Sequence, residues 1–314
     1  MVNEYMFKMF LGDNIADDSV TRETVYGTKY YTKLNTDKTA WEEIAKAAVE
    51  YGYKSVLIEL ADGVKYETHP EIAIEGAWEV EELKEELGKL REMGLTVYPK
   101  LNFSTAHDAW LGLYSRMVST DEYYELARDL IHEVIDIFDT PELFHFGLDD
   151  EGHHAQVRYD YVCFRQHDLY WHDYKFFLEC IREKGVRPWV AMDPYLVDEG
   201  KFLEYTDKDV VVSPLYEGSF YARTNPVTPN PVTENGKRLE SFSKLQNLGY
   251  EIIPTFIQKN TRVAVSQIIK YVNNVISSDK IKAMLITPEL NTTHSKKFSF
   301  CETFIGVSEA TKAL

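Results

Sequence analysis

The chain has 314 residues, of which 44% are hydrophobic and 27% are charged, and its formal net charge is −17. This charge disfavours nucleic acid as a partner because phosphate backbones would be repelled. No stretch approaches the roughly 20 apolar residues of a membrane span, so a membrane partner is not expected either. The N-terminus lacks the basic and apolar regions of a signal peptide, which predicts a cytoplasmic protein, or a secreted one if such a peptide has been removed.

The three cysteines, Cys163, Cys180 and Cys301, are far apart and odd in number. This spacing predicts neither a disulfide framework nor a zinc site. We expect no cofactor, and nothing in the sequence indicates an oligomeric state.

Short apolar runs alternate along the chain with longer amphipathic stretches. The runs are nearly continuous and rich in β-branched residues, as expected of strands buried on both faces. We predict strands, in chain order, at 7–11, 55–59, 96–100, 143–147, 188–192, 210–213, 252–256 and 283–287. Apolar residues at helical spacing predict helices at 39–50, 80–93, 121–138, 173–184, 238–248 and 263–278.

A strand followed by a helix, repeated eight times, is the pattern of a (β/α)8 TIM barrel. We therefore predict one α/β domain of this fold over residues 1–314. A doubly wound open sheet is the rival, but no Gly-rich dinucleotide-binding motif follows the first strand. The stretch 221–236 is rich in Pro, Asn and Thr, and it predicts a long loop after the sixth strand.

In a TIM barrel, the residues at the carboxyl ends of the strands face the substrate. Acidic and amide side chains dominate these positions, which suits sugar hydroxyls and the positively charged transition state of glycoside cleavage. The candidates are Asp13, Asn14, Glu59, Asp62, Lys100, Asn102, His107, Asp149, Asp150, Glu151, Asp193, Tyr216, Glu217, Gln258 and Glu289. Trp110, Trp171 and Tyr216 are candidates for stacking on a sugar ring.

The most specific feature is the run Asp149-Asp150-Glu151 at the end of the fourth predicted strand. Three adjacent carboxyls repel one another, which raises the pKa of at least one of them. A carboxyl that is still protonated near neutral pH can donate its proton to a leaving glycosidic oxygen. We therefore predict that these three residues are the catalytic residues of a glycoside hydrolase that acts on a terminal sugar.

Three segments between residues 63 and 152 resemble the catalytic barrel of family 20 glycoside hydrolases, the β-N-acetylhexosaminidase family. The segments are Val-Lys-Tyr-Glu-Thr-His-Pro-Glu at 64–71, Tyr-Pro-Lys-Leu-Asn and the following His at 98–107, and Phe-His-Phe-Gly-Leu-Asp-Asp at 144–150. The sequence resembles an uncharacterised bacterial branch of such barrels more closely still. The sequence pattern of that branch is Pro-Lys-Leu-Asn-Phe-Ser-x-x-His-Asp-x-Trp. The resemblance places Asn102, His107 and His145 among the sugar-binding candidates.

The resemblance also implies roles for the acidic run. In the family, the Asp orients the substrate's 2-acetamido group, which itself attacks, and the following Glu is the general acid and base. Asp149 matches the orienting residue, whereas Asp150 stands where the family has the longer Glu. Either Asp150 reaches the substrate by a small shift, or Glu151 takes the role, or the site no longer hydrolyses.

Three functional hypotheses follow for this barrel. The first is a glycoside hydrolase with a carbohydrate substrate, and the second is a carbohydrate-binding barrel that does not catalyse. The third is a metal-dependent sugar isomerase or lyase, because barrels of that type place carboxylates and His around a divalent ion. Its candidate ligands are Glu59, Asp149, Glu151, Glu289 and His107.

Overall fold

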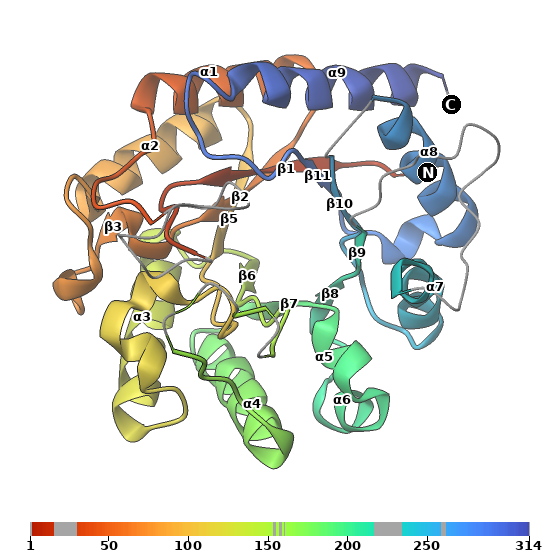
Figure 1. The fold of residues 1–314 in the computed structure, drawn as a ribbon. Helices are drawn as coiled ribbons and strands as arrows, with labels where there is room; N and C mark the ends of the chain where they lie inside the picture. The colour runs from red at the N-terminus through yellow and green to blue at the C-terminus, as the bar shows by residue number, and fades with distance from the viewer. Residues whose placement is uncertain are drawn as a thin grey trace.

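The chain forms a ring of parallel strands surrounded by helices in a computed structural model (Figure 1). The structure describes residues 2–15, 30–152, 155, 156, 159, 161–216, 234–258 and 262–313. The strands are β1 (Tyr5–Phe10), β2 (Ser55–Glu59), β3 (Val64–Lys65), β4 (Trp78–Glu79), β5 (Thr96–Lys100), β6 (Leu143–His145), β7 (Arg187–Ala191), β8 (Val211–Ser213), β9 (Leu215–Tyr216), β10 (Thr255–Ile257) and β11 (Met284–Thr287). Their order in the main sheet is β8-β7-β6-β5-β2-β1-β11-β10-β9, and β3 and β4 form a separate pair.

The helices cover the outside of the ring (Figure 1). They are α1 (Lys38–Glu50), α2 (Val80–Glu92), α3 (Asp121–Ile137), α4 (His167–Glu183), α5 (Asp193–Val197), α6 (Glu199–Tyr205), α7 (Glu234–Asn247), α8 (Arg262–Val275) and α9 (Lys297–Lys312). Short 3-10 turns lie at Ala61–Gly63, Pro70–Ile72, Ala109–Arg116 and Ser278–Lys280. Among the helices that the structure describes, none has both the length and the apolar character needed to cross a bilayer.

The barrel closes through a sixth strand that is divided at Pro214 into β8 and β9. β8 pairs with β7, and β9 pairs with β10. Between the two pairings, the N–H of Ile253 donates to the carbonyl of Val212 at 3.0 Å, and the N–H of Thr255 donates to the carbonyl of Pro214 at 2.9 Å. Counting β8 and β9 as one strand, the sheet is a (β/α)8 barrel, and the predicted fold is confirmed.

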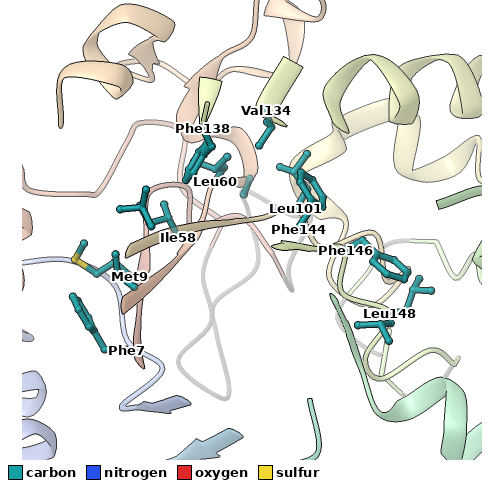
Figure 2. Packing of buried hydrophobic residues seen from close by; sticks show 14 of the residues in the cluster. Phe7, Met9, Ile58, Leu60, Leu101, Val134, Phe138, Phe144, Phe146 and Leu148 are labelled. Atoms are coloured by element: carbon teal, nitrogen blue, oxygen red, sulfur yellow. The ribbon is translucent and has the colours of Figure 1, made fainter. Parts of the chain in front are cut away.

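The barrel interior is apolar in one layer and charged in the next. The apolar layer consists of Met6, Leu57, Tyr98, Leu143, Trp189, Val211, Ile253, Ala283 and Leu285. Because side chains alternate between the two faces of a strand, the next inward positions on the first four barrel strands are Lys8, Glu59, Lys100 and His145, all buried. Outward residues such as Phe7, Met9 and Ile58 belong to the larger cluster under the helices (Figure 2).

The predicted strands lie close to the observed ones, while the helices differ more. α4 begins at His167, six residues before the predicted start, and α5, α6 and α9 were not predicted. Of the predicted loop 221–236, residues 221–233 lie outside the described part of the chain, and 234–236 begin α7. The start of α3 is capped by Thr120, whose Oγ1 accepts the N–H of Tyr123 at 3.3 Å.

Candidate active site

A network of buried ion pairs forms the floor at the carboxyl ends of the strands. Oε2 of Glu59 lies 3.0 Å from Nζ of Lys8 and 2.8 Å from Nζ of Lys100, and Lys8 lies 2.5 Å from Oε1 of Glu289. Burial opposes the charge of Glu59, but Lys100 and Lys8 outweigh it and hold its pKa below the ordinary value. Glu59 is therefore ionised and paired inside the barrel, and its side chain is 1% exposed.

His145 lies in the same layer as a neutral imidazole. Burial, helped by the nearby charge of Lys100, holds the pKa of His145 well below its ordinary value. Its Nδ1 accepts the N–H of Gly147 at 3.0 Å, so the proton of the neutral ring is on Nε2. The ring packs against Trp189, with centroids 4.6 Å apart.

Asp149 is held in one orientation by two side chains from the loop after β5. Asn102 donates from Nδ2 to Oδ1 of Asp149 at 2.8 Å, and Nδ1 of His107 lies 3.4 Å from Oδ2. Burial opposes ionisation, but His107 and Lys100 outweigh it and hold the pKa of Asp149 well below its ordinary value. Asp149 is therefore a fixed carboxylate. Its pKa is set by His107 and Lys100 and not by repulsion within the acidic run.

The ion pair between Asp149 and His107 lowers the pKa of Asp149 and raises the pKa of His107. Burial lowers the pKa of His107, but the larger combined effect of Asp149 and Asp150 raises it to about 9. At neutral pH, His107 and Asp149 therefore form an imidazolium–carboxylate pair.

The backbone after β6 has an unusual conformation that turns the acidic side chains in different directions. Gly147, Leu148 and Asp150 have φ values of +79°, +63° and +57°. Positive φ is uncommon in non-glycine residues and is often associated with functional sites. A regular strand would place Asp149 and Glu151 on one face. Here Asp149 contacts Asn102, whereas Glu151 contacts Arg165.

The three adjacent carboxyls consequently have three different environments. The side chain of Asp149 is 20% exposed, that of Asp150 is 53% exposed, and that of Glu151 is 4% exposed. Oε1 of Glu151 lies 2.5 Å from Nη1 of Arg165, and its Oε2 accepts a hydrogen bond from the hydroxyl of Thr105. Of the three, Asp150 is the most accessible to a substrate.

Arg165 is a buried hub that fixes the loop carrying Glu151. Besides Glu151, it donates from Nε to Oδ2 of Asp173 at 2.6 Å and from Nη2 to the hydroxyl of Tyr123 at 2.9 Å. Its Nη1 also donates to the carbonyl of Phe103 at 3.1 Å. Glu151 therefore connects the acidic loop to α3 and α4 rather than projecting freely from it.

Asp193 lies at the end of the neighbouring strand, β7, and shares an arginine with Asp150. Nη2 of Arg238 lies 3.1 Å from Oδ1 of Asp193 and 3.9 Å from Oδ1 of Asp150. Burial raises the pKa of Asp193 to about 6, against the effect of Arg238 and with a contribution from Asp149. Its Oδ2 is buried and has no hydrogen-bond partner among the described residues.

A second acidic group lies at the ends of β1 and β2. Asn14 donates from Nδ2 to Oδ2 of Asp62 at 2.6 Å, and Oδ2 of Asp13 accepts from Asn35 and Asn291 at 3.0 and 2.9 Å. Burial raises the pKa of Asp62 to about 7 and that of Asp13 to about 6.

The other candidates lie beside or beneath these groups. Trp110 is 2% exposed, and its Nε1 donates to the carbonyl of Asn102 at 3.0 Å, so it supports that loop from below. Tyr216 is buried and stacks on Phe256 with an interplanar angle of 14°. Gln258 is half-buried at the end of β10, and Glu217 lies outside the described residues.

Sequence reasoning found Lys100 but missed three other cations that hold the acids in place, Lys8, Arg165 and Arg238. Lys8 could have been found, because it lies two residues after Met6 on the inward face of β1. Arg165 and Arg238 gave no such signal, since both lie far along the chain from the strand ends that they contact.

The metal-dependent hypothesis is not supported by this arrangement. Within the described ranges, no three His, Cys, Asp or Glu side chains gather as they would around a metal ion. Its proposed ligands Glu59, Glu151 and Glu289 are instead paired with lysine or arginine.

Comparison with known proteins defines the class of fold. No model of a protein family matches the sequence, and no curated protein matches it. The fold does match the β-N-acetylhexosaminidase of Bacteroides fragilis NCTC 9343 with a TM-score of 0.64 at 13% identity, covering 98% of this chain and 65% of that one. The GH20 exo-β-N-acetylglucosaminidase of Vibrio harveyi, solved with N-acetylglucosamine, gives 0.64 at 12% identity, with 98% and 53% covered.

The GH20 β-N-acetylhexosaminidase of Streptomyces coelicolor A3(2) gives a TM-score of 0.62 at 11% identity, with 98% of this chain and 64% of that chain covered. The chain thus spans between about half and two thirds of the length of these three proteins. At such identities the likeness shows the fold: a family 20-like barrel, as the sequence resemblance predicted.

Proposed function

We propose that the protein is a glycoside hydrolase in which Asp149 stabilises the transition state and Asp150 protonates the leaving group. The observation that carries the proposal is the state of Asp149, which Asn102 and His107 orient and which is held ionised at the carboxyl end of β6. A fixed carboxylate at this place suits a transition state with positive charge on the sugar.

Asp150 is chosen as the acid because the neighbouring carboxyl of Glu151 is already bound inside the protein. Glu151 is bound by Arg165 and Thr105, so using it would require breaking a buried ion pair. Asp150 is half exposed and adjacent to Asp149 in the chain. It also matches the position of the general acid in the family that the sequence resembles. The carbohydrate substrate is supported by the fold of the hexosaminidases above.

A test compares Asp149→Asn, Asp150→Asn and Glu151→Gln on a panel of glycosides that includes N-acetyl-β-glucosaminides. Loss of a general acid costs about 10²–10⁴ in rate. For Asp150→Asn we expect this loss in kcat/KM with an alkyl leaving group, and a much smaller loss with 4-nitrophenol, which leaves without protonation. Asp149→Asn should lose activity with both.

Two outcomes would overturn the proposal. If Asp193→Asn shows the leaving-group dependence and Asp150→Asn does not, the proton comes from the neighbouring strand. If the wild-type protein binds sugars by calorimetry but hydrolyses none of the glycosides, the barrel is a carbohydrate-binding protein without catalysis.

A further inference from the structure

A cavity of about 400 Å³ lies beside the acidic loop, outside the ring of strand ends. Its walls come from the loop after β6, the first turn of α4, and the junction of α5 and α6, elements that lie next to one another in Figure 1. Glu151 and Gly152 are among its lining residues, together with Asp168 and Lys201. The cavity therefore begins where the acidic run ends.

The charges around the cavity are largely compensated by one another. Glu151 is paired with Arg165, and Nζ of Lys201 lies 2.5 Å from Oδ1 of Asp168. Asp198 caps α6 by accepting the N–H of Lys201 at 3.0 Å. A site of this kind has no strong attraction for an ion, but it offers many hydrogen-bonding groups to a neutral ligand.

Three aromatic side chains, Phe164, Tyr170 and Trp171, also line the wall. Aromatic rings with a few polar groups are the usual lining of a ligand pocket, and the volume lies within the usual range of about 300–1,000 Å³. Sugar rings present apolar C–H faces together with hydroxyls, so both parts of this lining match a sugar.

The hydroxyl of Tyr170 is the evidence that this cavity binds a ligand. Tyr170 is 4% exposed, and its hydroxyl is buried with no hydrogen-bond partner among the described residues. The hydroxyl lies near Glu151, whose charge adds to the effect of burial in raising the pKa of Tyr170. A buried hydroxyl without a partner is costly. A ligand oxygen that reached the Tyr170 hydroxyl through a small shift of the cavity wall would gain a hydrogen-bond donor that no described residue uses.

We propose that this cavity binds the sugar residue on the leaving-group side of the bond that is cleaved. The proposal rests on the proposed hydrolase function. Glu151 lines the cavity, and Asp150, the proposed acid, immediately precedes it in the chain. The acid must contact the glycosidic oxygen, which joins the sugar at Asp149 to the sugar in the cavity.

The test compares a disaccharide with the methyl glycoside of the same terminal sugar. Val197→Trp fills the cavity from its exposed edge, and Tyr170→Phe removes only the unpaired hydroxyl. We expect Val197→Trp to lower kcat/KM for the disaccharide about tenfold more than for the methyl glycoside. For Tyr170→Phe, the differential loss should be about three- to tenfold, the value of one hydrogen bond.

Two controls separate binding from folding. Leu113→Trp adds the same ring at a site that is 84% exposed and does not line the cavity, and it should leave the ratio of the two substrates unchanged. The melting temperature of Tyr170→Phe should be equal to or above that of the wild type, because the lost hydroxyl has no partner in the part of the chain that the structure describes. An unchanged substrate ratio in both cavity variants would overturn the proposal.

Calorimetry with the same disaccharide distinguishes failure of the cavity from failure of the hydrolase. If nothing is hydrolysed but Tyr170→Phe and Val197→Trp weaken disaccharide binding, the cavity is a sugar site and the hydrolase proposal fails alone. If the disaccharide is hydrolysed and neither variant changes its kcat/KM or binding, the hydrolase proposal stands and the cavity proposal fails.

Discussion

A β-carbon at Gly147 would lie 1.8 Å from Oδ1 of Asn102, so the chain can pass over Asn102 only with a glycine at this position. Gly147 also has a φ of +79°, which glycine adopts without strain. The same Oδ1 accepts the N–H of Ser104 at 3.1 Å, while Nδ2 holds Asp149. The turn after β6 and the orientation of Asp149 therefore depend on the same side chain.

Replacing Gly147 by alanine should displace Asn102 and lower the free energy of unfolding by about 3 kcal/mol. Gly185→Ala is the matched control, because Gly185 has a φ of +73° and nothing within 4 Å of an added β-carbon. It should cost about 1 kcal/mol from the backbone alone. Urea unfolding measures both variants, and equal losses would mean that Asn102 moves aside without cost.

The Asp149–His107 pair should make stability depend on pH in the alkaline range. The pKa of His107 is about 9 in the folded protein, above its usual unfolded value of about 6.5. The folded state therefore holds this proton more tightly, so the stabilisation is complete below about pH 6.5 and is lost as the pH rises through about 9. The loss should be about 3 kcal/mol.

His107→Gln removes this dependence and serves as the reference in unfolding curves between pH 6 and 10. In Asp149→Asn, burial and Lys100 are opposed by Asp150 alone, so the pKa of His107, followed by NMR, should fall well below 9. An Asp149→Asn protein in which that pKa stays near 9 would contradict the ion pair.

Asp150 and Glu151 should differ sharply in their effect on stability. Glu151→Gln leaves Arg165 facing a neutral amide in a buried site, which we expect to cost about 2–4 kcal/mol. Asp150→Asn changes a half-exposed side chain and keeps a residue type that tolerates its positive φ, so the change should be within about 0.5 kcal/mol.

Chemical unfolding measures these two variants together with Arg165→Met and the double variant Arg165→Met/Glu151→Gln. Removal of both partners should cost less than the sum of the single losses, since Glu151 and Arg165 interact directly. Additive losses would show that the ion pair contributes nothing.

Asp62 should destabilise the fold at alkaline pH. Its pKa is raised to about 7, so the folded state retains a proton that the unfolded chain loses near pH 4. Stability attributable to this carboxyl therefore falls as the pH rises from about 4 to about 7. Asp62→Asn should equal the wild type at pH 4 and exceed it by about 4 kcal/mol at pH 8.

Asp13→Asn is the comparison for this prediction. Both amide groups that bind Asp13 donate to its Oδ2, so an asparagine can keep them only in one orientation, and the gain at pH 8 should be smaller. An Asp62→Asn protein that is less stable than the wild type at both pH values would contradict a protonated Asp62.

The strands and the polar positions at their ends were predictable because local patterns encode them. Alternation along β1 even implies that Lys8 faces inward with Met6. The directions of Asp150 and Glu151 were not predictable, because positive φ at Leu148 and Asp150 interrupts the alternation. The contact between Arg165 and Glu151 depends on where α4 packs, which residue spacing does not reveal.

The charged layer has a consequence for the electrostatics of the whole molecule. A chain with a formal charge of −17 buries the cations Lys8, Lys100 and Arg165 at one end of its barrel, each against a carboxylate. The protein thus carries its own counter-ions at the strand ends, opposite in sign to its surface. Glu59 and Asp149 can therefore stay deprotonated when a bound molecule displaces bulk water, without drawing salt ions from outside.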